Sequence, residues 1–226
     1  MIHGTPALSL SRLASDGRHH GAIAAEVAVA RALIPLALRP GVEVFHDLTL
    51  PGTREPINID HIVLVDGLAV VIDTKYWASG WYWTRRGVTH RGFHPAPHAD
   101  RRGLSFTMDL LTKRVNALSL IGRAADNVVG LAAVVTAGTG RVHIKLYRPP
   151  GANTSAIPAH RLVRHVEHLI KGHGAPDQAY VQWLAGRCTD ATIITSLHVG
   201  TGHWATDGIT HERHPTLTHI NTRGSH

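Results

Sequence analysis

The segment that decides the fold is Ile57–Tyr76, with the sequence INIDHIVLVDGLAVVIDTKY. Its two apolar runs, Ile57–Val65 and Leu68–Tyr76, are separated only by Asp66-Gly67. An Asp-Gly pair between apolar runs is a strong signal for a β-hairpin. Both runs are almost wholly apolar. The segment therefore predicts a hairpin inside a sheet.

Each of these two apolar strands carries a carboxylate, Asp60 in the first and Asp73 in the second. Buried carboxylates are costly unless they are paired or bound to a metal. If the hairpin is in register, Asp60 lies within a few ångströms of Asp73, and the two charges repel by a few kcal/mol. A divalent cation removes this repulsion, and oxygen ligands suit Mg²⁺ or Mn²⁺. We therefore expect a carboxylate-held metal site.

Lys75 lies two residues beyond Asp73, so both side chains leave the same face of the strand. Only four of the 23 cationic residues are lysines, which makes this position unusual in the chain. A metal ion can polarise a phosphoryl oxygen and activate water. A neighbouring ammonium can orient that water or stabilise the transition-state charge. The alternative is that Asp73 and Lys75 form a solvated pair on an edge strand.

The regions around the hairpin predict a mixed central sheet flanked by helices, an α/β fold. Residues 1–17 are expected to form an irregular arm, 18–174 the core, and 175–226 a C-terminal extension that is rich in His and Thr at its end. The periodicity and turn residues predict helices over 21–38, 105–121, 158–170 and 180–186, and further strands over 42–50, 81–90, 128–136, 141–147 and 191–199.

Composition excludes several classes of protein. Of the 226 residues, 43% are hydrophobic, which is too many for a disordered chain, and Gly and Pro follow no collagen period. The single cysteine, Cys188, cannot form an internal disulfide, so a reducing compartment is expected. We found neither a clean membrane-spanning stretch nor a secretory signal in the sequence. These features predict a soluble, cytoplasmic protein without membrane contact.

The net charge of +7 suggests a polyanionic partner, although solubility or genome composition would also explain it. Aromatic residues interleaved with arginines can stack on bases and contact phosphates. The alternative for the aromatic residues is packing within the sheet. The residues predicted to contact nucleic acid are Trp83, Arg85, Arg86, Lys113 and, beside Asp60, His61.

The 19 histidines do not predict a zinc site. The sequence HERH at residues 211–214 is one residue short of the H-E-x-x-H motif, so its histidines would not share a helical face correctly. Scattered surface histidines are the simpler interpretation.

The chain resembles the PD-(D/E)xK nucleases and, more narrowly, the nuclease-related domain (NERD) family. The resemblance rests on four stretches: an early helix with GAIAAE at 21–26, LTLP at 48–51, IDH at 59–61 and IDTKYW at 72–77. It implies a restriction-endonuclease-like fold and metal-dependent DNA cleavage. The implied catalytic residues are Glu26, Asp60, Asp73 and Lys75, and the implied metal ligands are Asp60, Asp73 and Glu26.

The chain departs from the family pattern at Asn58, where family members usually have Gln, and at Asp73, where they usually have Glu. Asn58 is expected to contact the metal-binding side chains without binding the metal itself. The predicted function is a magnesium- or manganese-dependent deoxyribonuclease, expected to be an endonuclease. RNA as substrate and a homodimer stay open. The alternatives are a DNA-binding protein that keeps the fold without catalysis, and a protein-interaction module.

Overall fold

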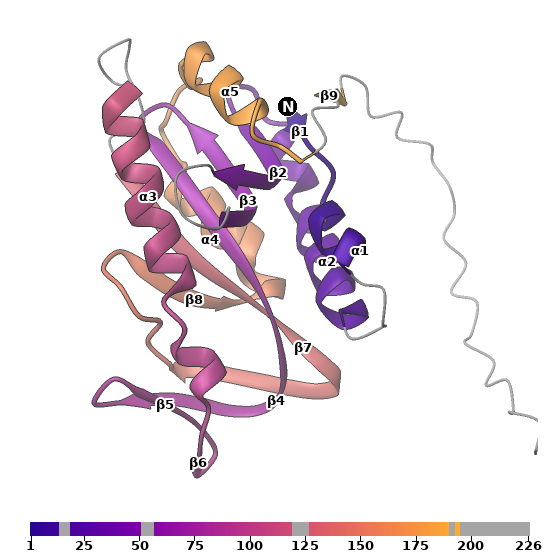
Figure 1. The fold of residues 1–226 in the computed structure, drawn as a ribbon, viewed down its shortest axis with the longest axis vertical. Coiled ribbons are helices and arrows are strands. Elements are labelled where there is room, and N and C mark those ends of the chain that lie inside the picture. Colours follow the sequence, from indigo (N-terminus) through magenta and orange to yellow (C-terminus); the bar gives the residue numbers. More distant parts are fainter. Residues whose placement is uncertain (14–18, 51–56, 119–126, 190–192, 195–226) are drawn as a thin grey trace, which may run out of the picture. The chain divides into compact units, whose positions relative to one another are not determined.

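The predicted hairpin forms the centre of a mixed sheet (Figure 1). β3 (Ile57–Val65) pairs antiparallel with β4 (Leu68–Arg85), and Val65 lies opposite Leu68 across the Asp66-Gly67 turn. The other edge of β3 pairs antiparallel with β2 (Glu43–Leu50). The computed structural model describes residues 1–13, 19–50, 57–118, 127–189 and 193–194.

The sheet continues on both sides of these three strands. β7 (Asn127–Leu146) runs parallel to β4, and β8 (Thr154–Pro158) runs parallel to β7. On the other side, β1 (Ile2–His3) pairs parallel with β2 and antiparallel with β9 (Ile193–Ile194). The outer half of β4 also pairs with β5 (Val88–Arg91), which pairs with β6 (His94–Pro95). In the described residues these nine strands form one sheet.

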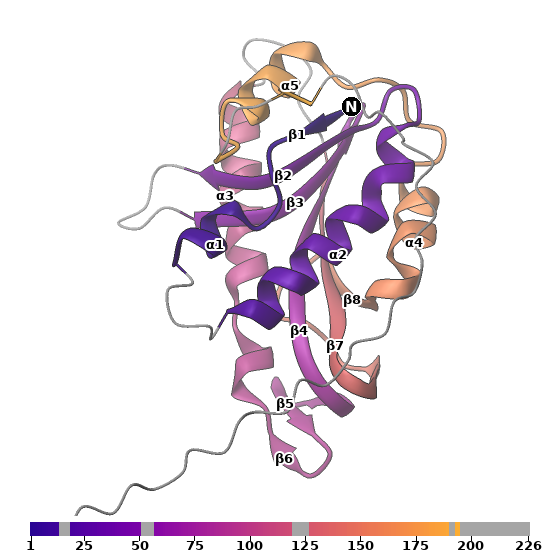
Figure 2. The same ribbon diagram turned by 90° about the vertical axis from the view of Figure 1, so that its right-hand side faces the viewer.

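Helices cover both faces of the sheet, which explains why the central strands are apolar on both sides (Figure 2). α2 (His20–Ala37) and α4 (Leu162–Leu169) pack on one face. α3 (Gly103–Leu118) and α5 (Gln178–Ala185) pack on the other. Each fully buried Leu, Ile or Val contributes about 1.5–3 kcal/mol. The two layers confirm the predicted α/β architecture, a mixed sheet flanked by helices.

The helix α2 is long and apolar enough to cross a membrane by length and composition alone. In this structure its apolar residues have another use, because Val29, Leu33 and Leu36 are buried in the core against the sheet. Core helices of soluble proteins commonly have this composition.

The structure corrects the prediction of separate strands in two places. The predicted run 68–76 and the start of the strand predicted over 81–90 are one strand, β4, and the strands predicted over 128–136 and 141–147 are also one strand, β7. Both strands bend where their pairing register shifts, after Ala78 and Ala137. Glycines make this bend possible: a Cβ on Gly140 would lie 2.3 Å from the Cβ of Ser79.

The termini also differ from the prediction. The expected irregular arm contains β1 and a short helix, α1 (Leu8–Leu13), because residues 2–3 add to the edge of the sheet beside β2. Before α3 the chain forms β6 and a 3₁₀ turn over Pro97–Asp100, and a second such turn over Ala159–Arg161 precedes α4. β8 was not predicted. In the C-terminal part, α5 packs into the same core as α3.

Several predicted features lie partly or wholly outside the described residues. They are the end of the helix predicted to reach residue 121, the strand predicted over 191–199 except Ile193–Ile194, the histidine sequence at 211–214, and the His- and Thr-rich end of the chain.

Candidate active site

The predicted acidic strands border a cleft of about 260 Å³. The polar residues in its lining are Asp60 and Asn58 from β3, Asp73 and Lys75 from β4, and Thr107 from α3. Leu104 and Phe106 of α3 add an apolar wall. The cleft therefore brings three of the four residues predicted to be catalytic next to one another, with a helix on the opposite side.

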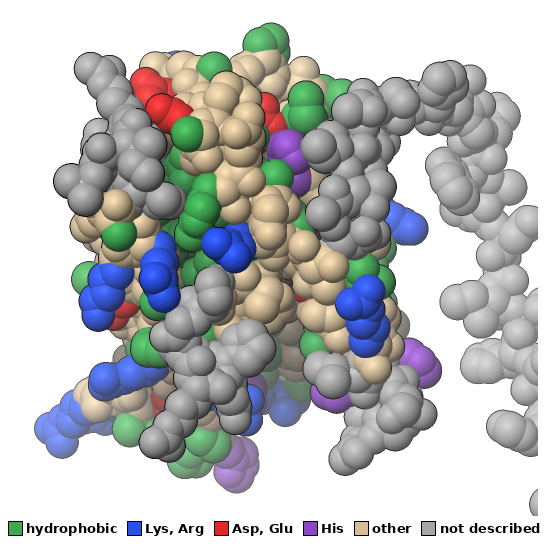
Figure 3. Space-filling view, turned by 45° about the horizontal axis from the view of Figure 1, so that its top comes forward, with side chains coloured by type: hydrophobic (Ala, Val, Ile, Leu, Met, Phe, Trp, Pro, Cys, Tyr) green, Lys and Arg blue, Asp and Glu red, His purple; other side chains and the backbone are tan. Residues whose placement is uncertain are grey.

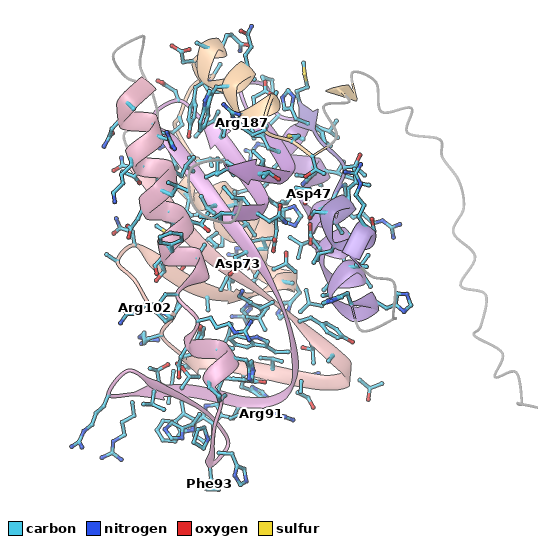
Figure 4. The ribbon with its side chains drawn as sticks, viewed as in Figure 1. Asp47, Asp73, Arg91, Phe93, Arg102 and Arg187 are labelled. Atoms are coloured by element: carbon cyan, nitrogen blue, oxygen red, sulfur yellow. The ribbon has the colours of Figure 1, made fainter. Side chains whose placement is uncertain are left out.

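Asp73 and Lys75 form an ion pair within β4. The Nζ atom of Lys75 lies 2.6 Å from Oδ2 of Asp73 and donates to Oδ1 at 2.8 Å. The two side chains are 22% and 32% exposed, so the pair is reachable from solvent. This geometry follows from the strand, because side chains two residues apart leave the same face. Figure 4 shows Asp73 near the middle of the long strand β4.

Asp60 lies on β3 beside this ion pair. His61 pairs with Ile72, so the next position along the hairpin places Asp60 opposite Asp73. The backbone N–H of Thr74 donates to Oδ2 of Asp60 at 2.6 Å. Burial raises the pKa of Asp60 well above its usual range, the carboxylates of Asp73 and Glu26 raise it further, and the Thr74 N–H and Lys75 act in the opposite direction.

Glu26, on α2, is buried, with 1% of its surface exposed, and it does not line the cleft. Its Oε1 accepts a hydrogen bond from the backbone N–H of Ala7 at 2.8 Å. Burial raises the pKa of Glu26 to about 7; the Ala7 N–H opposes this shift, and Asp47 and Asp73 add to it. Glu26 thus belongs to the electrostatic surroundings of the site, while its carboxylate anchors the N-terminal segment.

Asp47 is a further acidic residue at this site that the sequence analysis missed. His46 pairs with His61 and Leu48 with Ile59, so Asp47 stands opposite Asp60 between these two pairs. The three aspartates therefore occupy one row across β2, β3 and β4. Asp47 is fully buried and has a positive φ of 52°. The sequence gave only a weak signal, because Asp47 is a carboxylate within the predicted strand 42–50, which also carries Glu43 and His46.

The side chain of Asp47 binds the helix α1. It accepts hydrogen bonds from the backbone N–H of Ser9, at 2.8 Å, and from the Ser9 hydroxyl. Its backbone carbonyl accepts from the N–H and the hydroxyl of Thr189. Asn58 donates from Nδ2 to the Ser9 Oγ at 3.1 Å. Asn58 therefore connects the cleft to α1, rather than contacting Asp60 or Asp73.

Two buried histidines, His46 and His61, are the sequence neighbours of Asp47 and Asp60. The Nδ1 atoms of His46 and His61 are 2.8 Å apart, and Nε2 of His61 lies 3.3 Å from the hydroxyl of Thr74. Burial, with His3 nearby, lowers the pKa of His46 to about 4; burial, with His46 nearby, lowers the pKa of His61 well below its usual range. Both imidazoles are therefore neutral near pH 7, and one donates to the other.

The predicted DNA contacts are spread over different surfaces. Arg85 and Arg86 are exposed at the tip of the β4–β5 hairpin. Trp83 stacks on His90 with ring centroids 4.5 Å apart, as expected for packing within the sheet. Lys113 is exposed on α3. On the face shown in Figure 3, cationic side chains are spread over the surface and few acidic ones are visible.

His61 does not fit the prediction of a DNA contact. Its side chain is fully buried, so it cannot reach a ligand at the surface. The adjacent position in sequence gave no information on burial, because His61 and Asp60 leave β3 in different directions. The structure instead places His61 between His46 and Thr74.

The chemistry of the donor set fits a hard divalent cation. The carboxylates of Asp60 and Asp73 repel each other, and a cation between them would relieve that repulsion. Among the described residues, no group of three His, Cys, Asp or Glu side chains is close enough to hold a metal ion. Such a cation would thus be held by two carboxylates, with water and substrate oxygens as the other ligands, as is usual for Mg²⁺.

Comparison with known proteins found a match for part of the chain. Residues 22–121, which are 100 of the 226, match the family model described as nuclease-related domain (NERD). The matched segment contains Glu26, Asp47, Asp60, Asp73 and Lys75. No significant match was found among curated proteins or solved structures.

Proposed function

Because residues 22–121 match the nuclease-related domain family, we propose that this protein is a metal-dependent deoxyribonuclease that hydrolyses phosphodiester bonds at the cleft of Asp60, Asp73 and Lys75. The observation that carries the proposal is the Asp73–Lys75 ion pair, which lies beside the carboxylate of Asp60 in a cleft open to solvent. This arrangement combines two metal-binding oxygen donors with one ammonium.

Asp60 and Asp73 would hold Mg²⁺ or Mn²⁺, which when bound supplies a Lewis acid for the scissile phosphate and lowers the pKa of water. The Thr74 N–H fixes the orientation of the Asp60 carboxylate. Lys75 would neutralise charge that develops on the phosphate oxygens, because its ammonium is already held in the cleft by Asp73. Glu26 and Asp47 contribute negative charge and hold the segment around α1 in place.

A DNA-binding protein without catalysis is the second candidate. The observation in its favour is that Lys75 contacts both carboxylate oxygens of Asp73. A metal ion would have to compete with this ammonium for the same oxygens, and a pair that stays closed would leave the fold able to bind DNA but not to cut it.

A plasmid-nicking assay separates the two candidates. Supercoiled plasmid is incubated with wild-type protein, Lys75→Ala, Asp73→Asn and the control Lys171→Ala in Mg²⁺, Mn²⁺ or EDTA. We expect nicking by the wild type and the control in at least one metal, a loss of about 100-fold or more in both cleft variants, and no nicking in EDTA. Lys171 is exposed and does not line the cleft, so its loss tests for the effect of charge alone.

Equal nicking by wild type and both cleft variants in every metal would sink the catalytic proposal, provided that circular dichroism shows all proteins folded. Retained, salt-dependent DNA binding by the wild type in that case would select the second candidate.

A further inference from the structure

A second and larger concavity lies on the other side of β7 from the hairpin strands. It is a groove of about 1830 Å³ lined by the outer half of β7, by β8 and by the first turns of α4 with the 3₁₀ turn before it. We call it the β7–α4 groove. All of its lining residues lie between 134 and 168, outside the segment that matches the nuclease-related family.

The charged residues that line the β7–α4 groove are all cationic. Its cationic residues are Arg141, Lys145 and Arg148 on β7 and just beyond it, and Arg161 and Arg164 at the start of α4. Four histidines also line the groove, and none of its lining residues is Asp or Glu. The cationic side chains thus come from two separate elements and border the same concave surface.

These cations are available to a ligand. All five side chains are exposed, and none of them forms an ion pair with a described carboxylate. The guanidinium of Arg148 is held by the backbone carbonyls of Lys145 and Tyr147, at 3.1 Å each, which fixes its position without neutralising its charge. Five uncompensated charges around one groove repel each other, so an anionic ligand would relieve that repulsion.

We propose that the β7–α4 groove binds the phosphate backbone of nucleic acid. Arginine suits phosphate because its planar fork donates two parallel hydrogen bonds. A concave groove fits a linear polyanion better than a flat lipid surface. The groove also begins beside the cleft, because Val134, which lines it, pairs with Lys75 across the parallel strands. The proposal rests on the proposed function only in taking the polyanion to be nucleic acid.

The test measures binding in EDTA, so that cleavage does not interfere. A short fluorescein-labelled DNA duplex is titrated over a series of NaCl concentrations with wild-type protein, Arg141→Ala/Arg164→Ala, and the control Arg31→Ala/Lys171→Ala. The control removes the same number of exposed cationic side chains, neither of which lines the groove. Circular dichroism and thermal unfolding check that each variant is folded.

Each lost phosphate contact lowers the slope of log K against log salt concentration by about 0.9. We therefore expect the slope of the groove variant to be smaller in magnitude by about 1.8 than that of the wild type. If the two proteins bind equally at 1 M salt, the variant then binds about 60-fold more weakly at 0.1 M salt. The control should keep the wild-type slope. A groove variant that keeps the wild-type slope and affinity overturns the proposal.

Two further measurements separate this proposal from a membrane-binding groove and from the proposed catalysis. Anionic phosphatidylserine vesicles that bind in a groove-dependent manner, while DNA binding does not depend on the groove, would also overturn it in favour of a membrane surface. If the plasmid is never nicked but the groove variant still loses DNA affinity, the proposed catalysis fails and the groove proposal stands.

Discussion

At the scale of single residues, the site is defined by acidic groups whose environments differ. Asp73 is neutralised by Lys75, and Asp47 is held by Ser9, whereas Glu26 accepts only one backbone hydrogen bond in the described structure and is nearly inaccessible to water. Ionising Glu26 is therefore costly, and burial raises its pKa to about 7. Its protonation state should be visible in the stability of the metal-free protein.

Replacing Glu26 by Gln should stabilise the metal-free protein at high pH. In the unfolded chain the carboxyl ionises near pH 4.5, and in the folded protein near 7. Between these values the folded state binds more protons, so its contribution to stability is complete below pH 4.5, falls as the pH rises and is lost above 7. Glutamine keeps the acceptor for the Ala7 N–H and removes the charge.

We expect Glu26→Gln to exceed the wild type in free energy of unfolding by about 3 kcal/mol at most at pH 8, with a smaller difference at pH 5. Urea unfolding in EDTA at both pH values measures this. Glu167→Gln is the control, because Glu167 is 45% exposed and pairs only with Arg39 among the described residues. A variant that is less stable than the wild type at pH 8 would contradict the pKa assigned to Glu26.

At the scale of elements, the long bent strands β4 and β7 connect the cleft to surfaces further away. The inner half of β4 carries Asp73 and Lys75, and its outer half ends in the hairpin with β5. The hairpin turn has positive φ at both central residues, 51° at Arg86 and 78° at Gly87. Such a turn favours Asn or Gly at its first central position, so an arginine there is an unfavourable choice for the backbone alone.

Two substitutions at Arg86 separate its backbone cost from its charge. Arg86→Asn removes the charge at a position where Asn tolerates positive φ, so the free energy of unfolding should stay equal or rise by a few tenths of a kcal/mol. Arg86→Ala removes the same charge and keeps the strain of a Cβ at positive φ.

If Arg86 contacts a phosphate, both variants should lose about one in the slope of log K for DNA against log salt concentration. Anisotropy titrations and thermal unfolding measure the two effects separately. Unchanged slopes in both variants would remove Arg86 from the DNA-binding surface, whatever their stability.

At the scale of the whole molecule, a net charge of +7 coexists with carboxylates on four different elements that raise one another's pKa or lie beside one another. The surface charge attracts a polyanion over long distances, and a divalent cation would relieve the repulsion between the carboxylates of Asp60 and Asp73 at short range. Binding of a divalent cation that prefers the folded state must therefore raise the stability of the whole protein.

Mg²⁺ at ten times its Kd should add about 1.4 kcal/mol, which is a rise of about 3–6 °C in Tm for a domain of this size. Differential scanning fluorimetry at pH 8, with NaCl at matched ionic strength, measures this. The rise should disappear in Asp60→Asn and persist in Asp109→Asn, whose carboxylate is exposed on α3. An equal rise in both variants would place the cation elsewhere.

The sequence by itself determined the central hairpin and the positions of the two carboxylates and the lysine that it carries. The Asp66-Gly67 turn and the apolar runs on either side define the hairpin, because a short turn leaves these strands only one way to pair. The same local rules placed Asp60 beside Asp73, and Lys75 on the same face as Asp73. The family resemblance followed from those positions, and the matching segment supports it.

Only the tertiary structure decided which polar residues are buried and what they contact. Burial depends on which helix covers which face, so no local pattern assigned His61 to the core, Glu26 to Ala7, or Asp47 to Ser9. β4 and β7 are each one long bent strand. At the bend residues 79 and 140, which are far apart in sequence, approach each other closely. The β7–α4 groove exists only because these folded strands bring its arginines next to those of α4.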